Sequence, residues 1–430
     1  MLIRLWRYCD KIFKLTNHLL QLRNQGFTKK NNEPFITTIL FMAMFMRLKS
    51  FNALEDTMKR NRKVWEKVLN TDYLPSIDTI PRRLRNSDIK GLANMAQKFN
   101  HKLRRNKALN TSQASNGLMV AAIDGHETFS SRKRCCSKCK RRRVKVKGKW
   151  IYEYFHSYVV CQLILVSVPV FMDIEPIKPG ENELTAAKRL IKRILKEQPR
   201  MVDIFTFDAL YLDSKLLNLL DKERKYWIAV LKNENREAYK EVNGLLAQTK
   251  ATKTKIGNRS VTMYDMHDLV GWDKLDKTFR AVVADEQWYQ WEMNPKREKE
   301  KVLKTSHWRW LTNMPPTYHP KIVHRFGHGR WNEEERGFND LATNCHFDHP
   351  YHHHPIALLA MLWIIAIAFN LSYAFYQRNL KPEIRKEKIR SRSQLAVTII
   401  ETFNSLTLLT LKLDEPIFSI LPLSAQPQPP

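Results

Sequence analysis

The chain has 430 residues and a formal net charge of +30 at pH 7, because it carries 73 lysines and arginines against 43 aspartates and glutamates. With 43% hydrophobic residues it can bury a large core, which argues against the small basic proteins of ribosomes and chromatin. The length predicts two to three domains, and the spread-out basic excess favours a polyanionic partner, above all nucleic acid, over a basic surface kept for solubility alone.

Residues 1–110 are predicted to form an all-helical domain. Apolar residues recur at three- and four-residue spacing in EPFITTILFMAMFMRL (33–48) and FNALEDTMKRNRKVWEKVL (51–69), which is the pattern of amphipathic helices. The next segment carries Arg82 and Arg83, which a helix could lay against DNA as helix-turn-helix modules do. A packing and dimerisation domain with a solvated charged face is an equally good interpretation.

No secretory signal is recognisable at the start of the chain, because charges interrupt the apolar positions of MLIRLWRYCDKIFKL. Most of the six cysteines are scattered. We therefore expect a reducing, cytoplasmic location in association with the nucleoid.

From residue 117 the hydrophobic period changes from that of helices to that of strands. Strands and helices are predicted in the order strand, strand, strand, helix, strand, helix, strand. The segments are LMVAAID (118–124), SYVVCQLILV (157–166), PVFMDIEPI (169–177), ENELTAAKRLIKRILKEQ (181–198), MVDIFTFDAL (201–210), SKLLNLLDKE (214–223) and YWIAVLK (226–232). This is the element order of the ribonuclease H fold. We predict the α/β class, with a ribonuclease-H-like mixed sheet flanked by helices, built from residues 111–233 and 320–410.

Two aspartates, Asp124 and Asp208, end the first and fourth of these strands. In a ribonuclease-H-like sheet the two strands are neighbours, so the carboxylates would lie side by side. A third acidic residue, Glu334, lies in a charged stretch typical of a helix start. Three converging carboxylates can hold two divalent cations about 4 Å apart, so these are the predicted catalytic ligands of Mg²⁺ or Mn²⁺. Alone, either aspartate could merely cap a strand-to-loop transition.

Just after the first strand, the basic loop RKRCCSKCKRRRVKVKGK carries a cysteine cluster. Cys136 and Cys139 have the Cys-x-x-Cys spacing of half a tetrahedral zinc site. The other half could come from Cys345 and His346, or from the histidines at 349–354. A loop of free thiols whose lysines and arginines bind phosphate is the simpler interpretation, and both stay open.

The interval between Asp208 and Glu334 is longer than one strand and one helix need, and we predict a β-rich insertion at 234–319. Its expected strands are NRSVTMYDMHDL (258–269), KTFRAVVADEQWYQWEM (277–293) and SHWRWLTNM (306–314). Aromatic faces beside arginine and lysine can stack a base flipped out of a DNA end, so Trp308 is a predicted DNA contact. The tryptophans of the insertion can also be core residues, given their large apolar area.

One segment, IALLAMLWIIAIAFNLSYAFY (356–376), is long and apolar enough to span a membrane. We interpret it as a core helix buried on all sides, because nothing else in this polar, basic chain suits a membrane. We therefore expect no membrane partner. Residues 411–430 end in LPLSAQPQPP and are expected to form a disordered tail.

Four segments resemble the motifs of bacterial insertion-sequence transposases of the DDE type, in order and with matching spacing. They are AAIDGHETFSS, KPGENELTAAKRL, FTFDALYLDS and RWNEEERGFNDL, within residues 70–375. The resemblance implies a ribonuclease-H-like core with a β-strand insertion and Asp124, Asp208 and Glu334 as metal ligands. It also implies that Arg330, four residues before Glu334, contacts phosphate. The register RW-x-x-E-x-x-GFN selects Glu334 among three consecutive glutamates.

Two positions depart from the family pattern. Gly327 stands where the family often has a tyrosine, and Ala342 stands where a lysine is usual. Both family residues contact the DNA end, so their absence indicates a degraded or altered element. The three predicted carboxylates are present.

Together these features predict a DDE transposase that cleaves and joins the DNA ends of an insertion sequence by two-metal phosphoryl transfer. Its partners would be terminal inverted repeats and target DNA, bound by a homodimer. Two alternatives stay open, namely an inactive or domesticated transposase-derived DNA-binding protein and a nuclease of the same fold.

Overall fold

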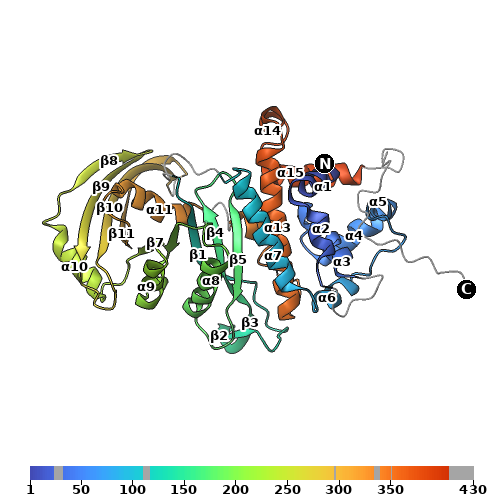
Figure 1. Ribbon diagram of the computed structural model, residues 1–430, viewed down its shortest axis with the longest axis horizontal. Helices are drawn as coiled ribbons and strands as arrows, with labels where there is room; N and C mark the ends of the chain where they lie inside the picture. Colours follow the sequence, from blue (N-terminus) through green and yellow to red (C-terminus); the bar gives the residue numbers. More distant parts are fainter. Residues whose placement is uncertain (24–31, 110–116, 295–296, 334–338, 350, 406–430) are drawn as a thin grey trace, which may run out of the picture.

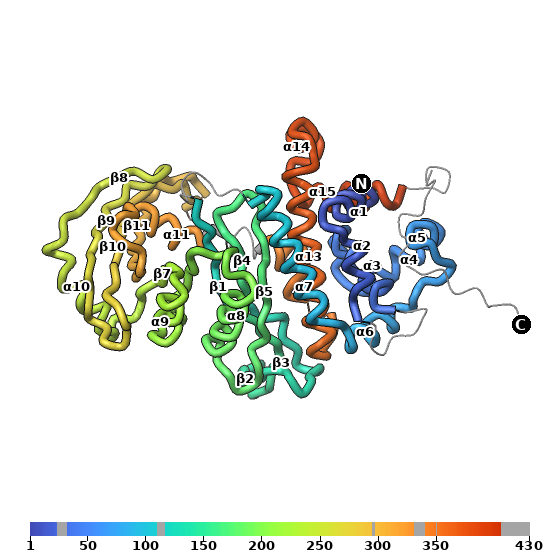
Figure 2. The backbone as a smooth tube through the Cα atoms, in the orientation of Figure 1, coloured from blue at the N-terminus to red at the C-terminus, as the bar shows by residue number. Residues whose placement is uncertain are grey.

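The computed structural model describes residues 1–23, 32–109, 117–294, 297–333, 339–349 and 351–405. These residues form a mixed α/β fold with a large mixed sheet and fifteen α-helices. Figure 1 shows helices α1 to α6 at one end of the molecule and the strands β7 to β11 at the other, with α7 and α13 between them. The same order is visible in the backbone trace of Figure 2.

The N-terminal part is helical, as predicted for residues 1–110. Asn32 caps α3 by accepting from the N–H of Phe35, and every residue of α3 is buried. Asp88 caps α7 in the same way, through the N–H of Gly91. The helices are α1 (Leu2–Phe13), α2 (Leu15–Leu20), α3 (Glu33–Phe45), α4 (Phe51–Arg60), α5 (Arg62–Leu69), α6 (Thr79–Leu84) and α7 (Ile89–Arg105).

The first five strands of the main sheet confirm the predicted element order. Strands β1, β4 and β5 form an antiparallel meander. Strand β6 pairs with β1 in parallel, and β7 pairs with β6 in parallel. Helices α8 and α9 pack on this part of the sheet. The elements are β1 (Val120–Glu127), β4 (Ser157–Ile164), β5 (Val170–Pro176), α8 (Glu183–Glu197), β6 (Ile204–Phe207), α9 (Ser214–Lys222) and β7 (Tyr226–Val230).

The strands that follow extend the same sheet. Leu311 of β11 pairs with Ala229 of β7 in antiparallel register. The result is one nine-stranded sheet with the order β5-β4-β1-β6-β7-β11-β10-β9-β8. The added elements are α10 (Glu237–Leu246), β8 (Thr252–Ile256), β9 (Arg259–Leu269), β10 (Phe279–Met293) and β11 (Lys299–Thr312).

The prediction of a loop at 132–149 was wrong in its second half. Strands β2 (Lys140–Val146) and β3 (Lys149–Phe155) form a separate two-stranded antiparallel ribbon. Lys147 and Gly148, both at positive φ (47° and 81°), make the tight turn between them. Charges at almost every position of β2 hide the alternation that marks a strand with one buried face.

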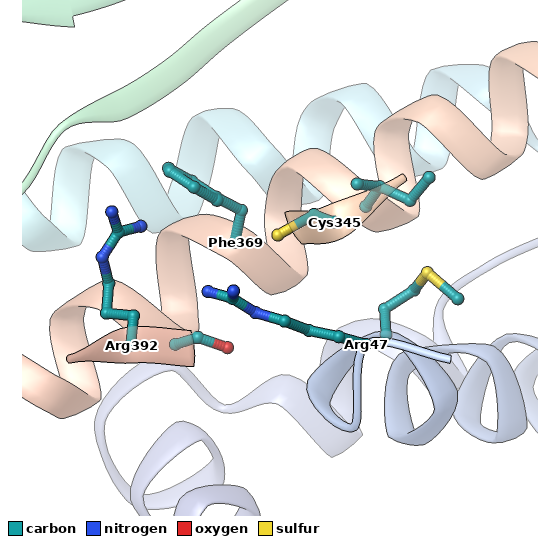
Figure 3. A pocket seen from close by; sticks show the side chains of 7 residues that line it. Arg47, Cys345, Phe369 and Arg392 are labelled. Atoms are coloured by element: carbon teal, nitrogen blue, oxygen red, sulfur yellow. The ribbon is translucent and has the colours of Figure 1, made fainter. Parts of the chain in front are cut away.

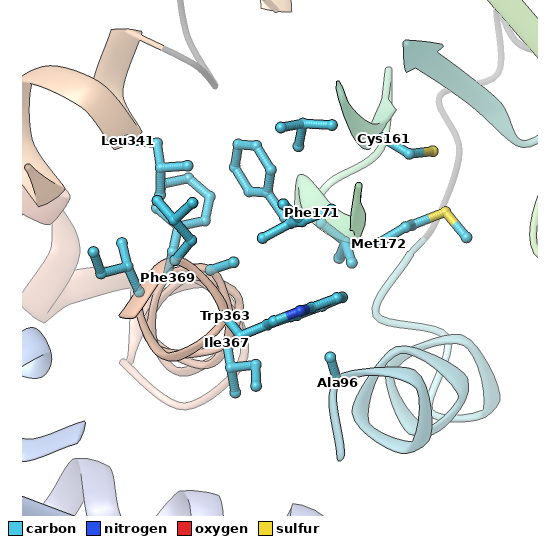
Figure 4. Close-up of a cluster of buried hydrophobic side chains, with 14 of the residues drawn as sticks. Ala96, Cys161, Phe171, Met172, Leu341, Trp363, Ile367 and Phe369 are labelled. Carbon is cyan, nitrogen blue, oxygen red and sulfur yellow. The ribbon is translucent and has the colours of Figure 1, made fainter. Parts of the chain in front are cut away.

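Helix α13 (Pro355–Arg378) is the predicted core helix. It is the one helix among the described residues that is long and apolar enough to cross a membrane, and 78% of its most apolar window is buried inside the protein. Figure 4 shows Trp363 and Phe369 of this helix on the side that faces Phe171 and Met172 of β5. The remaining helices are α11 (Pro320–Glu333), α12 (Asn339–Cys345), α14 (Pro382–Glu387) and α15 (Arg392–Asn404).

Strand β5 is an edge strand of the sheet, and helix α13 packs against it. The side-chain amide of Asn370 donates to the carbonyl of Phe171 at 2.9 Å and accepts from its N–H at 3.0 Å. This pair of bonds satisfies backbone groups that an edge strand would otherwise leave unpaired in the core. A polar residue within an otherwise apolar helix is thereby explained.

Candidate functional site

The side chains of β1 point alternately to the two faces of the sheet, and this alternation determines the face to which Asp124 belongs. Val120 and Ala122 are buried in the cluster that includes Val323 and Phe326 of α11, whereas Ala121 and Ile123 belong to the main core on the other face. Side chains two residues apart share a face of a strand. Asp124 therefore continues the row of Val120 and Ala122, on the face that α11 covers.

Asp208 joins Asp124 through the register of the neighbouring strand. In the parallel ladder Ala122 pairs with Thr206. Continued by two residues beyond this last pair of the ladder, the same register sets Asp124 opposite Asp208, with both side chains on one face. Neighbouring strands are about 4.8 Å apart. The register thus places the predicted carboxylates on neighbouring strands, Asp124 within β1 and Asp208 directly after β6.

Each carboxylate is paired with a basic side chain. Nζ of Lys232 lies 3.1 Å from Oδ1 of Asp208, and Nη1 of Arg330 lies 3.6 Å from Oδ2 of Asp124. Burial alone would raise the pKa of Asp208, but the N–H of Ala209, Lys232 and Arg330 together outweigh it and lower that pKa. Asp208 is therefore an ionised, oxygen-donating group of the kind that Mg²⁺ and Mn²⁺ bind.

Arg330 reaches this place because of the spacing of α11. Val323 and Phe326 are fully buried against the sheet, and Arg330 follows Phe326 at four residues, on the same stripe of the helix. Its side chain is only 11% exposed. The helix lies across β6, β7, β10 and β11. The predicted phosphate-binding arginine is thus held directly over the aspartates.

The remaining predicted site residues are Glu334, Arg82, Arg83 and Trp308. Glu334 follows the last residue of α11 and lies outside the residues that the structure describes. Arg82 and Arg83 lie on α6, which packs against α13 and α3 rather than beside the aspartates. Trp308 is half-buried on β11. Their roles as ligand and DNA contacts stay predictions.

A glutamate that was not among the predicted site residues, Glu183, lies close to β1 on the opposite face of the sheet from α11. Glu183 is the first residue of α8, and its Oε1 accepts from the hydroxyl of Tyr211 at 2.6 Å. Its carboxylate lies so close to Gly125 that a Cβ at residue 125 would stand 2.1 Å from Oε2. The glycine directly after Asp124 is the feature of the sequence that indicates this contact, because glycine allows another group to approach the backbone closely.

Trp308 belongs to an aromatic stack behind α11. Its ring lies parallel to that of Trp310, with centroids 5.7 Å apart, and the edge of His328 meets it at 4.8 Å. Its Nε1 donates to Oγ of Ser306 at 3.2 Å. The indole is therefore held in a fixed position with part of its surface accessible.

Beside this stack, a buried carboxylate ties α11 to the sheet. Oε1 of Glu286 accepts from His324 at 2.8 Å and from His328 at 2.5 Å, while Oε2 pairs with Arg259. Burial alone would raise the pKa of Glu286, but these bonds lower it well below its usual range. A cation bound by Glu286, His324 and His328 would have to compete with Arg259, so we interpret the group as structural.

This group borders a pocket of about 670 Å³. Basic side chains dominate its polar lining, and they come from α11 and from the start of β9. The lining residues include Arg259, Lys321, Arg325 and His328. Such a basic lining favours an anionic ligand.

The structure gives the cysteine pair a partner that was not predicted, His156. Among the described residues, Cys136 and Cys139 are joined by His156, and their ligand atoms all lie within 4.8 Å of one another. Cys345 is buried elsewhere, in a small pocket with Arg47 and Arg392 (Figure 3). Of the two predicted alternatives for the other half of the site, Cys345 does not apply, because α12 packs that thiol into the helical core, whereas His353 of the other alternative lies near His156.

Comparison with models of protein families found no match to this chain, and comparison with curated proteins found none either.

Proposed function

We propose that this protein is a DDE-type transposase that cleaves and joins DNA ends by metal-dependent phosphoryl transfer. One observation carries the proposal. Asp124 lies within β1 and Asp208 directly follows β6, which pairs with β1 in parallel, and Nη1 of Arg330 lies 3.6 Å from Oδ2 of Asp124. Far-separated carboxylates that converge in this way are what a divalent metal site for phosphodiester chemistry requires.

The order of the strands supports a ribonuclease-H-like core. Strands β5, β4 and β1 form the meander, and β6 and β7 follow in parallel, which is the order that the sequence pattern predicts. Asp124 lies within the first strand of this series, which continues to Glu127, and Asp208 directly follows the fourth. Glu334, four residues after Arg330 in the sequence, is proposed as the third ligand.

Divalent ions held by these carboxylates would activate the attacking hydroxyl and stabilise the departing oxygen. The chain's own basic groups have a separate task. Arg330 and Lys232 neutralise the carboxylates in the structure, and we propose that they turn to the phosphates of the DNA end when metal replaces them. Arginine suits this task because its planar guanidinium can bind two phosphate oxygens at once.

A lysine near the site could replace the one missing at Ala342. Lys49 and Ala342 line one pocket of about 570 Å³, together with Phe129 and Asp348. Oδ1 of Asp348 in turn lies 2.6 Å from Nε2 of His126 of β1. The pocket therefore adjoins the end of the strand that carries Asp124. We propose that Lys49 contacts the phosphate backbone of bound DNA.

The test is a strand-transfer assay with a labelled DNA end that carries the inverted repeats flanking the coding region, in Mg²⁺ and in EDTA. Metal-dependent nicking followed by joining to target DNA supports the proposal. Nicking without joining would identify a nuclease. Binding of the repeats without nicking would identify a catalytically silent DNA-binding protein.

A further inference from the structure

Three metal-ligating atoms meet outside the carboxylate site. The Sγ atoms of Cys136 and Cys139 are 3.6 Å apart, and Nε2 of His156 lies 3.4 Å from the first and 3.3 Å from the second. The cysteines come from the segment before β2, and His156 lies between β3 and β4. Residues distant in sequence therefore form one compact group.

These separations fit a tetrahedral zinc ion. Bonds of about 2.3 Å to sulfur and about 2.0 Å to nitrogen place two sulfurs about 3.8 Å apart and a sulfur and a nitrogen about 3.5 Å apart. Mg²⁺ and Ca²⁺ prefer oxygen ligands, so a set of two thiols and an imidazole selects Zn²⁺ instead. The three atoms form one triangular face of the tetrahedron.

The surroundings of the group orient the ligands. The backbone N–H of Lys138 donates to Sγ of Cys136 at 3.4 Å, and the N–H of Cys136 donates to Sγ of Cys139 at 3.2 Å. The ring of His156 is also hydrogen-bonded to the backbone of His353. Such contacts fix thiolates and the imidazole in the orientation that a metal needs.

We infer that Cys136, Cys139 and His156 bind a structural Zn²⁺ ion. The fourth position is open to water or to His353, whose ring centroid lies 6.5 Å from that of His156. The carbonyl of His156 accepts from the N–H of Thr128, just beyond β1, at 2.9 Å. The ion would therefore tie three segments together at one point, namely the cysteine loop, the β3–β4 junction and the end of the strand that carries Asp124.

This position gives the ion a mechanical role. The β2–β3 ribbon projects from the main sheet beside α8 (Figure 1) and carries Arg141 and Arg143, stacked on Tyr152 and Trp150. A two-stranded ribbon on its own is only marginally stable. Zinc at its base would hold this basic ribbon at a constant angle to the sheet.

Metal analysis of the purified full-length protein tests the inference. We expect about one zinc per chain, and at least about fivefold less in Cys136→Ser, Cys139→Ser and His156→Ala, because each removes a ligand. Cys135→Ser is the matched control, since this neighbouring thiol is exposed and lies outside the ligand group. Equal zinc in wild type and in the three ligand variants would overturn the inference, as would zinc-free wild type that stays zinc-free after Zn²⁺ is added.

A thiol assay on the unmodified protein avoids variants that fail to fold. Cys9, Cys161 and Cys345 are buried, and Cys135 is exposed. With zinc bound, Cys135 alone should react rapidly with a thiol reagent, and a chelator should then expose Cys136 and Cys139 as well. A thiol count that the chelator leaves unchanged would contradict the inference. Neither assay depends on transposase activity, so a failed strand-transfer assay leaves both results intact.

Discussion

The indole of Trp310 lies where a side chain at residue 327 would begin. A Cβ built on Gly327 would stand 2.2 Å from Nε1 of Trp310. Helix α11 can therefore rest on β11 only because residue 327 is glycine. A tyrosine, which the family pattern often has at this position, would need a different arrangement of Trp310.

Replacement of Gly327 by alanine should consequently destabilise the protein. Alanine in place of an exposed helical glycine usually stabilises by about 0.5–1 kcal/mol. At residue 327 we expect the opposite sign, a loss of about 1–3 kcal/mol, because the added methyl overpacks the indole. Gly244→Ala in α10 is the control, because its Cβ would meet nothing within 4 Å. Denaturant unfolding measures both, and stabilisation by Gly327→Ala would disprove the packing argument.

Asp124→Asn and Asp208→Asn should each lower metal-dependent DNA cleavage at least about 100-fold, because each removes a charged metal ligand. DNA binding should persist, since neither change removes a phosphate contact. Asp268→Asn, at an exposed position with φ of 55°, is a matched control that should keep full activity. Wild-type cleavage by either variant, measured with a labelled DNA end, would refute the assignment.

Asn370→Ala should destabilise the protein by about 1–3 kcal/mol, because the N–H and carbonyl of Phe171 would lose their partner inside the core. Ser372→Ala in the same helix is the control, with an expected change within about 0.5 kcal/mol. Denaturant midpoints compare the two. Similar midpoints for Asn370→Ala and wild type would show that the N–H and carbonyl of Phe171 find other hydrogen-bond partners.

The stability of the helical part should depend on the protonation of Glu33. Burial raises the pKa of this glutamate to about 7, even though the N–H of Asp88 donates to it at 2.7 Å. The folded protein therefore holds a proton between about pH 4.5 and pH 7 that the unfolded chain releases. The contribution of this group to the free energy of unfolding is fully present below about pH 4.5 and is lost as the pH rises through about 7.

Glu33→Gln removes this titration and should flatten the corresponding part of the pH profile. Between pH 4.5 and pH 8, the free energy of unfolding of the variant should rise relative to that of wild type by on the order of 2 kcal/mol. Urea unfolding at several pH values provides the measurement. Parallel profiles for the two proteins would mean that Glu33 titrates normally in the folded state.

The basic ribbon should contribute to DNA binding through its charges. We expect Arg141→Gln combined with Arg143→Gln to weaken binding to duplexes of any sequence and to reduce the salt slope by about 2. Lys215→Gln combined with Lys222→Gln on α9 removes the same charge from another surface and is the control. Fluorescence anisotropy across a salt series decides between them, and equal slopes for the two double variants would remove the ribbon from the interface.

The sequence by itself determined the order of the core strands and helices and the position of Asp208 at the end of its strand, whereas β1 continues to Glu127, past its predicted end at Asp124. Hydrophobic periodicity is a local property, so it could be followed residue by residue along the chain. This periodicity is missing from β2, where charged residues stand in place of an apolar face. The core role of α13 followed from composition alone.

Only the tertiary structure decided which distant groups meet. The pairing of β11 with β7, the approach of Arg330 to Asp124 and the choice of His156 as partner of the cysteines depend on how whole elements pack. Packing is set by the combined burial of many side chains, and no single segment encodes it. Glu183 was missed for the same reason, because its closeness to Gly125 arises only when α8 docks on the sheet.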